Sequence, residues 1–252
     1  MTIYIVIPVH NEALNIVSVV SDTYRVLKRT NFNFKIIIIN DGSADETSNL
    51  LNKLPFSGSI EILHNNKRYG LGLALAIGLK HAVSLSTDED DIAVVMEGDG
   101  TSDVTLLPEI ISNIVRGKDI TIASRFLKES SLIGFSLSRK IFSYTVNHIF
   151  ALLCKAPRVK DYTILYRGYR INLLKKAFLD YGDRLIIMKQ FEGNTELLLK
   201  LARYNMNISE MPLVYDYSLK KSKSKMNIIL TVFGYLRLLY RQIIKNQFRD
   251  DK

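Results

Sequence analysis

Residues Lys35–Ser43 read KIIIINDGS, and this stretch decides the fold. A strand that is buried on only one face alternates apolar and polar residues, whereas four consecutive isoleucines predict a strand that is buried on both faces. Such strands lie inside parallel sheets that helices cover on both sides. The small polar residues that follow mark the carboxyl end of the strand and the start of a loop.

The chain on either side of this strand alternates strand-like and helix-like segments. In the first half, strands are predicted over Ile3–Pro8, Lys35–Asn40, Ser59–Leu63, Asp91–Met96 and Asp119–Ala123, and helices over Glu12–Arg29, Ser43–Leu54, Gly72–Leu85 and Leu106–Arg116. Repeated strand–helix units predict an α/β fold with a doubly wound, mostly parallel sheet flanked by helices. Ligands bind at the carboxyl ends of the strands in such sheets.

The second half of the chain is less regular. Helices are predicted over Ser138–Leu153, Ile171–Leu179, Asn194–Tyr204 and Asn227–Lys245, and strands over Thr163–Arg170 and Asn207–Pro212. No proline- or glycine-rich linker separates the halves. We therefore expect one domain over residues 1–225 and a C-terminal amphipathic helical extension over residues 226–252.

The chain has 252 residues, a formal net charge of +9 and a single cysteine, Cys154. The basic surplus predicts an anionic partner, and its densest cluster is Lys220, Lys221, Lys223 and Lys225. Because no zinc-finger, basic-zipper or RNP signature is present, phosphate substrates and lipid headgroups are favoured over nucleic acid. The lone cysteine excludes an intrachain disulfide and, with no signal-peptide pattern before the first strand, predicts a cytoplasmic location.

Two carboxylates follow the predicted strand Asp91–Met96, in the sequence Glu97-Gly98-Asp99-Gly100. Carboxylates are hard oxygen ligands that suit Mg²⁺ or Mn²⁺, and a divalent ion held there could support a departing diphosphate. The glycines allow the backbone to approach a ligand closely. An ordinary polar turn after a strand is an equally good interpretation of this tetrapeptide taken alone.

Polar residues also follow the first two predicted strands, and we expect these two loop tips to face the same crevice as the acidic tip, because parallel strands share a carboxyl edge. His10 could stack on a base, although a surface histidine is the simpler interpretation, and Glu12 suits the first turn of a helix. Asp41 could accept hydrogen bonds from a ribose or a base. For Ser43 and Asp45, turn and helix-capping roles are favoured, because Ser43 to Glu46 has capping-box spacing.

Basic residues occur at the same predicted edge of the sheet. Arg125 follows the fifth strand, and Arg139 opens the next helix, so either could meet phosphate oxygens or be an ordinary solvated arginine. The loop 66–72 has basic residues and glycines at a helix start, which can bind phosphate. Asp161 and Thr163 form a further polar group that could equally cap the strand that follows.

Together these segments resemble family-2 glycosyltransferases of the GT-A fold, and most of all the polyprenyl-phosphate glycosyltransferases. The resemblance runs from about Ile3 to Lys225. The motifs occur in the family's order: Pro8-Val-His-Asn-Glu12, Asn40-Asp-Gly-Ser43, Gly70-Leu-Gly72, Glu97-Gly-Asp99, Ser124-Arg125-Phe126, Asp161-Tyr-Thr163 and Ser224-Lys225.

The resemblance implies a role for each matched position. The residues that would surround the nucleoside are Pro8, His10, Glu12, Ile39 and Asp41. Those that would bind the metal and the diphosphate of a GDP- or UDP-sugar are Glu97, Gly98 and Asp99. Arg125 and Lys225 match phosphate-contacting positions, and Arg139 matches the acceptor-phosphate region. The chain departs from the pattern at Glu97, Asn40 and Leu219, where relatives carry aspartate, aspartate and a phosphate-binding arginine.

The resemblance also implies an inverting, single-displacement transfer that depends on Mg²⁺ or Mn²⁺. A polyprenyl-phosphate acceptor is already anionic and needs little help from a base. A hydroxyl acceptor on a polysaccharide or glycolipid needs one, and Asp161 is the candidate. Asp99, Arg125 and Asp161 are thus the expected catalytic residues. A catalytically silent nucleotide-sugar-binding protein is the third possibility.

The C-terminal segment Met226–Lys245 mixes apolar residues with arginines and lysines and follows the lysine cluster. This pattern is typical of a helix that lies in a membrane interface, and it equally suits a helix that packs on its own domain or on a second copy in a homodimer. We expect an enzyme held peripherally at the cytoplasmic face of a membrane.

Overall fold

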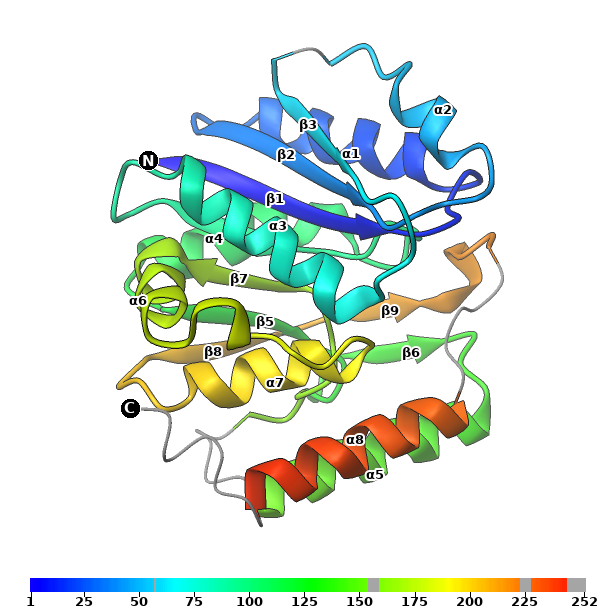
Figure 1. The fold of residues 1–252 in the computed structure, drawn as a ribbon, viewed down its shortest axis with the longest axis vertical. Coiled ribbons are helices and arrows are strands. Elements are labelled where there is room, and N and C mark those ends of the chain that lie inside the picture. Colours follow the sequence, from blue (N-terminus) through cyan, green and yellow to red (C-terminus); the bar gives the residue numbers. More distant parts are fainter. Residues whose placement is uncertain (57, 154–158, 223–227, 244–252) are drawn as a thin grey trace.

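A computed structural model describes residues 1–56, 58–153, 159–222 and 228–243 (Figure 1). Its main feature is one seven-stranded sheet in the order β3-β2-β1-β4-β7-β5-β8. The strands are β1 (Thr2–Val9), β2 (Asn33–Asn40), β3 (Ile60–His64), β4 (Ile92–Val95), β5 (Ile120–Ser124), β7 (Arg167–Arg170) and β8 (Ile208–Pro212). Only β7 runs antiparallel to its neighbours β4 and β5, so the predicted mostly parallel, doubly wound α/β sheet is confirmed.

The isoleucine run occupies the position that its composition predicts. Ile36 to Ile39 of β2 are all 0% exposed, and β2 pairs in parallel with β1 on one side and with β3 on the other. Full burial of one such side chain is worth about 1.5–3 kcal/mol relative to exposure. This run therefore anchors the half of the sheet that presents the loops after β1 and β2.

Helices cover both faces of the sheet (Figure 1). The contacts place α3 with α6 and α7 on one face, and α1 with α2 and α4 on the other. Their bounds are α1 (Ile16–Lys28), α2 (Thr47–Leu51), α3 (Leu71–Leu85), α4 (Leu107–Val115), α6 (Ile171–Tyr181) and α7 (Glu192–Leu201), with short 3-10 turns η1 (Val104–Leu106), η2 (Gly182–Arg184) and η3 (Tyr217–Leu219).

Two helix starts lie later than the sequence predicts. Helix α2 begins at Thr47, where Asp45 Oδ1 accepts the Thr47 amide at 3.0 Å, so Ser43 does not form the predicted capping box. Instead the Ser43 hydroxyl accepts the Asn11 amide at 2.9 Å. Helix α1 begins at Ile16 because Asn11 adopts a left-handed conformation with φ 53° and the chain turns before the helix starts. In both cases, the residues before the helix form hydrogen bonds that join the loop after β1 to the loop after β2.

Helices α5 (Leu137–Leu153) and α8 (Ile228–Ile243) lie side by side at one end of the molecule (Figure 1). Tyr235 and Leu238 of α8 are 5% and 0% exposed, so one face of this helix packs into the core. The strands β6 (Ser131–Ile133) and β9 (Val214–Asp216) form a small second sheet that the sequence did not predict. Along the chain, β6 precedes α5 and β9 precedes α8. Across the described residues, every helix is too short or too polar to cross a membrane.

Candidate active site

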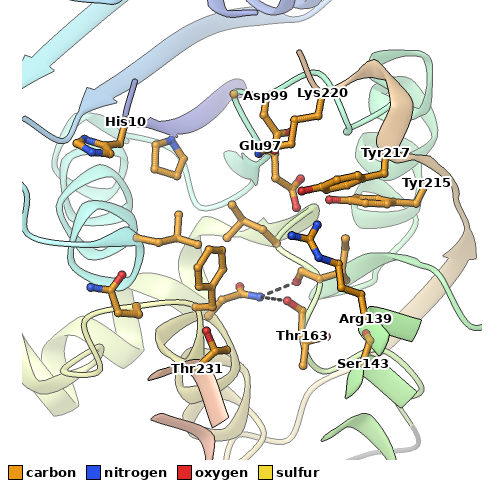
Figure 2. A pocket seen from close by; sticks show the side chains of 18 of the residues that line it. His10, Glu97, Asp99, Arg139, Ser143, Thr163, Tyr215, Tyr217, Lys220 and Thr231 are labelled. Carbon is orange, nitrogen blue, oxygen red and sulfur yellow. Dashed lines mark hydrogen bonds and ion pairs between the residues drawn. The ribbon is translucent and has the colours of Figure 1, made fainter. Parts of the chain in front are cut away.

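The loops after β1, β2 and β4 open onto one cavity of about 230 Å³ (Figure 2). Figure 2 shows His10 at the upper left, Asp99 and Lys220 at the top with Glu97 just below them, and Ser143 and Thr231 at the bottom. The predicted site residues that line the cavity are Pro8, His10, Glu12, Asp41, Glu97, Gly98, Asp99, Arg125 and Arg139. The expectation that these three loop tips face a common crevice is therefore confirmed.

Hydrogen bonds fasten the first two loops to each other. His10 Nδ1 lies 2.8 Å from the carbonyl oxygen of Asp41. Asn11 Oδ1 accepts the amide of Ala44 at 2.8 Å, in addition to the Asn11 amide bond to Ser43. The left-handed backbone of Asn11 is tolerated by asparagine better than by most side chains. These bonds hold the His10 ring at the mouth of the cavity.

The Asp41 carboxylate organises a third loop. Its Oδ1 accepts hydrogen bonds from Asn65 Nδ2 at 2.9 Å and from the Tyr69 amide at 2.8 Å, and its Oδ2 accepts the Gly70 amide at 2.8 Å. Gly70 has φ 100°, a conformation that glycine adopts without strain. Asp41 therefore shapes the loop 65–70 and brings Arg68 to the cavity wall.

The acidic tip after β4 contains two carboxylates in different surroundings. The Ser102 hydroxyl donates to Glu97 Oε2, and the Thr101 amide and hydroxyl donate to Asp99 Oδ1 at 3.1 and 2.5 Å. Burial raises the pKa of Glu97, and the neighbouring charge of Asp99 raises it further. A cation beside the two carboxylates would lower the free-energy cost of ionising Glu97, because a nearby positive charge favours the charged form of a carboxyl group.

Lys220 supplies a positive charge at this tip. Its ammonium forms an ion pair with Asp99 Oδ2 and lies 3.9 Å from Glu12 Oε1, and its side chain is only 9% exposed. The acidic tip is thus built to hold a cation. Within the described residues no group of three or more metal-ligating side chains gathers. Two carboxylates still fit Mg²⁺, which is commonly held by one or two carboxylates together with substrate phosphates and water.

Arg125 and Asp161 form a buried ion pair beneath the cavity. Arg125 Nε and Nη2 donate to the two Asp161 oxygens at 2.8 and 2.7 Å, and Nη2 also donates to the Thr163 hydroxyl at 2.6 Å. Burial opposes the charge of each partner, but their attraction outweighs it, so the pKa of Asp161 lies below its usual value and that of Arg125 above it.

Two of the predicted site residues do not line the cavity, and a third lies outside the described residues. Asp161 is 0% exposed and does not line the cavity. Its carboxylate also accepts the Ile164 amide at 3.0 Å, so it positions Arg125 and the turn before the strand. Its lowered pKa makes it a poor base. Ile39 is likewise 0% exposed and lies in the core, where it packs against Gly78 of α3. Lys225, with Lys223 and Cys154, lies outside the described residues.

Arg139 lies in the first turn of α5 and points into the cavity from the side opposite His10 (Figure 2). Its guanidinium lies 4.8 Å from the centroid of the Tyr217 ring, a cation–π contact that holds the side chain without neutralising it. Ser143, one turn further along the helix, lines the same cavity. This end of the site therefore offers an arginine and a hydroxyl to an incoming anion.

Several cavity residues were not singled out from the sequence as site residues. Tyr215 and Tyr217 come from β9 and η3, Phe142 and Val146 from α5, and Thr231 and Tyr235 from α8. Helical periodicity identifies the inner faces of α5 and α8, but it does not say that the two faces meet at one cavity. The tyrosines gave no signal, since two aromatic residues after a short strand are common.

Comparisons with known proteins agree with this geometry. Residues 4–178 match the family described as "Glycosyl transferase family 2", and the chain belongs to this family. It is 26% identical over 243 residues to a dolichol-phosphate mannosyltransferase of Pyrococcus furiosus, covering 96% of this chain and 63% of that protein. It is 25% identical over 196 residues to an undecaprenyl-phosphate mannosyltransferase of Micrococcus luteus, covering 77% of each.

Solved structures show the same fold. Glucosyl-3-phosphoglycerate synthase from Mycobacterium tuberculosis, in complex with Mn²⁺, UDP and phosphoglyceric acid, superposes with a TM-score of 0.65 at 14% identity, over 96% of this chain and 77% of that one. The same enzyme has been solved with Mg²⁺ and UDP at a TM-score of 0.64. The GT-A fold predicted from the sequence is thereby confirmed.

Proposed function

We propose that this protein transfers one sugar from a GDP- or UDP-sugar to a polyprenyl phosphate, with inversion at the anomeric carbon and with the help of Mg²⁺ or Mn²⁺. The observation that carries the proposal is the shared cavity: the three loop tips after β1, β2 and β4 line one end of it, and Arg139 with Ser143 lines the other. The named mannosyltransferase relatives support the acceptor class.

The donor would lie along the loops of the first half of the chain. His10, Pro8 and Arg68 form the end suited to a nucleoside, and Glu97 and Asp99 face the diphosphate. A divalent cation bound there would supply positive charge to the departing diphosphate. Arg125, fixed by Asp161, adds a cation that needs no reorganisation as negative charge develops, which is the usual form of electrostatic stabilisation.

The acceptor phosphate would be drawn to Arg139. An anionic phosphate oxygen can attack the anomeric carbon directly, from the side opposite the diphosphate, so the reaction needs no general base. This matches a site in which the candidate base Asp161 is buried and already paired with Arg125. The apolar lining from Phe142, Val146 and Tyr235 suits the first isoprene units of a lipid.

The lipid would reach this cavity from a membrane surface. The outward faces of α5 and α8 expose large apolar side chains, namely Leu137, Ile141, Tyr144, Leu152, Leu153, Ile229, Leu230, Phe233, Leu236 and Tyr240. On α8, residues 229, 233, 236 and 240 recur at helical spacing, as expected of an interfacial helix. The surface made by these ten side chains is called the α5/α8 apolar face below.

Radiolabelled sugar transfer tests the proposal. The full chain is incubated with Mn²⁺, labelled GDP-mannose or UDP-glucose, and vesicles that contain either polyprenyl phosphate or the unphosphorylated polyprenol. Label that enters a mild-acid-labile lipid only with the phosphorylated acceptor supports the proposal. Label that appears instead in a hydroxyl acceptor favours a polysaccharide or glycolipid transferase, and donor binding without any transfer favours a silent nucleotide-sugar-binding protein.

Variants at the acceptor end make this test specific. Arg139→Gln should lower transfer to polyprenyl phosphate by about 10²–10³-fold, the usual cost of losing one donor to a developing or transferred anion, and it should leave nucleotide binding unchanged. Lys140→Gln, the matched loss of charge at the next residue, lies outside the cavity lining and should behave like the wild type. Equal rates for the two variants would count against an acceptor site at Arg139.

A further inference from the structure

The ammonium of Lys220 lies between two carboxylates that come from different loops. Asp99 comes from the loop after β4 and Glu12 from the loop after β1, and the ammonium of Lys220 lies against both carboxylates. The segment that carries Lys220 crosses the acidic tip, with the Leu219 carbonyl oxygen 3.7 Å from the position that a Cβ on Gly100 would take. Lys220 thus joins the C-terminal part of the chain to the proposed donor site.

Two other arginines at the cavity have partners of their own and are not paired with Asp99. Arg125 is bound to Asp161, and Arg139 stacks on Tyr217. Within the described residues, the ion pair from Lys220 is the contact that neutralises Asp99. A divalent ion that reached Asp99 alone would meet a positive charge already bonded there, and like charges at such short range repel strongly away from bulk water.

A nucleotide sugar that arrives with the metal changes this balance. The diphosphate brings negative charge that both the metal and a displaced ammonium can contact. A lysine can make this move because its ammonium sits on a flexible four-carbon stem. The amide of the neighbouring Lys221 is held to Asn15 Oδ1 by a long hydrogen bond of 3.4 Å, which restrains this part of the segment only weakly.

We propose that Lys220 is an internal counter-cation of the donor site, which neutralises Asp99 before substrate binds and turns to the donor's diphosphate when the metal takes its place. The proposal rests on the donor site proposed above. It makes the binding of the metal and of the diphosphate depend on each other. Without the diphosphate, the metal is repelled by the ammonium of Lys220, and without the metal, the ammonium stays bonded to Asp99 and not to the diphosphate. Lys220 is then a diphosphate-binding residue that sets the order of loading.

Removing the charge of Lys220 should change the affinity for Mn²⁺ and the affinity for nucleotide in opposite directions. Lys220→Gln should bind Mn²⁺ alone more tightly, by about tenfold, because the competing ammonium is gone. With Mn²⁺ saturating, it should bind GDP or UDP more weakly, also by about tenfold, because a diphosphate contact is gone. The coupling between the two ligands should fall accordingly, and couplings of 5–150-fold are typical.

The measurement uses the full chain and needs no turnover. Free Mn²⁺ is followed by its electron paramagnetic resonance signal, and GDP and UDP binding by titration calorimetry with and without Mn²⁺. Lys220→Arg keeps the charge and should retain the weak binding of Mn²⁺ alone. Lys221→Gln removes an exposed neighbouring charge and should match the wild type. In the double variant Lys220→Gln/Asp99→Asn, the gain in Mn²⁺ affinity should disappear, which locates the ion at Asp99.

The outcomes separate this inference from the proposed function. If the wild type binds a nucleotide with Mn²⁺ but Lys220→Gln binds Mn²⁺ alone no more tightly, or binds nucleotide equally well, the role of Lys220 is refuted and the donor site stands. If the wild type binds neither GDP nor UDP with Mn²⁺, both proposals are overturned. Thermal unfolding of each variant checks that the folded state persists under the conditions of titration.

Discussion

At the scale of single residues, Asp99 is the carboxylate on which the proposed donor site depends most. One of its oxygens is held by Thr101 and the other by Lys220, so its geometry is fixed before any ligand binds. A divalent cation would meet a carboxylate that is already positioned, once the ammonium of Lys220 has moved away from it. Glu97 shares the site, and burial together with the charge of Asp99 raises the pKa of its carboxyl.

Asp99→Asn should abolish the Mn²⁺-dependent part of nucleotide binding, because a neutral amide is a poor ligand for a hard cation. The thermal unfolding midpoint, measured with GDP or UDP, should then no longer rise when Mn²⁺ is added, since only binding to the folded state stabilises it. Asp103→Asn is the control: Asp103 caps η1 outside the cavity lining, and asparagine caps equally well. A full Mn²⁺ response in Asp99→Asn would remove Asp99 from the site.

Asp161 contributes to stability as well as to the position of Arg125. Removing one partner of a buried ion pair leaves an unpaired charge, so Asp161→Asn should cost about 3–5 kcal/mol of unfolding free energy at neutral pH. Because the folded-state pKa of Asp161 lies below its ordinary 3.8, the stabilisation is complete above that value and is lost as pH falls through the folded-state pKa.

Urea unfolding at a series of pH values tests this prediction. The difference in unfolding free energy between wild type and Asp161→Asn should be constant from neutral pH to about pH 5 and should shrink in stronger acid. An equal difference at every pH would show that the loss comes from the missing hydrogen-bond acceptor and not from the charge.

At the scale of secondary-structure elements, α5 and α8 combine two roles. Their inner faces supply Phe142, Val146, Thr231 and Tyr235 to the cavity, and their outer faces make up the α5/α8 apolar face. A pair of helices arranged in this way can lie on a bilayer and still present a lipid headgroup to the reacting atoms. The sequence predicted α5 to within one residue, and the described part of α8 lies inside the predicted helix, because the apolar residues of both recur every three to four positions.

The α5/α8 apolar face gives a direct prediction for membrane binding. Phe233 is 65% exposed, so Phe233→Glu should leave the unfolding midpoint nearly unchanged and reduce flotation of the protein with vesicles that contain polyprenyl phosphate and anionic lipid. Leu179→Glu, at an 85% exposed position on α6, makes the same chemical change away from that face and should not alter flotation. Equal flotation of both variants would mean that another surface meets the membrane.

At the scale of the whole molecule, most of the fold and about half of the site arrangement follow from sequence pattern. Buried strands such as β1 and β2 are recognisable because parallel sheets demand continuous apolar runs. The three loop tips were predicted to meet because parallel strands share a carboxyl edge. The ion pair between Asp161 and Arg125 could not be predicted, since it joins residues 36 positions apart whose orientation depends on the antiparallel strand β7.

The position of Ile39 shows the same limit on a smaller scale. Residues alternate between the two faces of β2, and the motif match alone does not reveal which of them reaches the cavity. The side chain of Ile39 points to α3, against Gly78, and the next residue that lines the cavity is Asp41, two positions later in the loop. Chain order identifies the neighbourhood of a site, and the side-chain contacts then decide which members of a motif touch a ligand.

Besides the pairing of β4 with β7, the two halves of the molecule meet at a close backbone contact around Gly72 and Gly193. The Gly72 amide donates to the Lys189 carbonyl at 2.9 Å, and a Cβ on Gly72 would lie 2.0 Å from the Met188 carbonyl oxygen. A Cβ on Gly193 would in turn lie 2.7 Å from the Gly72 Cα. This close approach lets helix α3 of the first half pack on α7 of the second, and it places Phe191 in the cavity wall.

Gly72→Ala should therefore destabilise the protein, although alanine usually stabilises a helix by about 0.8–1 kcal/mol relative to glycine. The clash is with backbone atoms that cannot rotate away, so we expect a net loss of about 1–3 kcal/mol, as for other overpacked positions. Ser84→Ala, at an exposed site on the same helix, should be neutral or slightly stabilising. Urea unfolding of the two variants compares them directly. Because this contact also forms part of the cavity wall, Gly72→Ala should weaken nucleotide binding as it weakens the fold. A variant at wild-type stability would show that α3 can move away from α7 without cost.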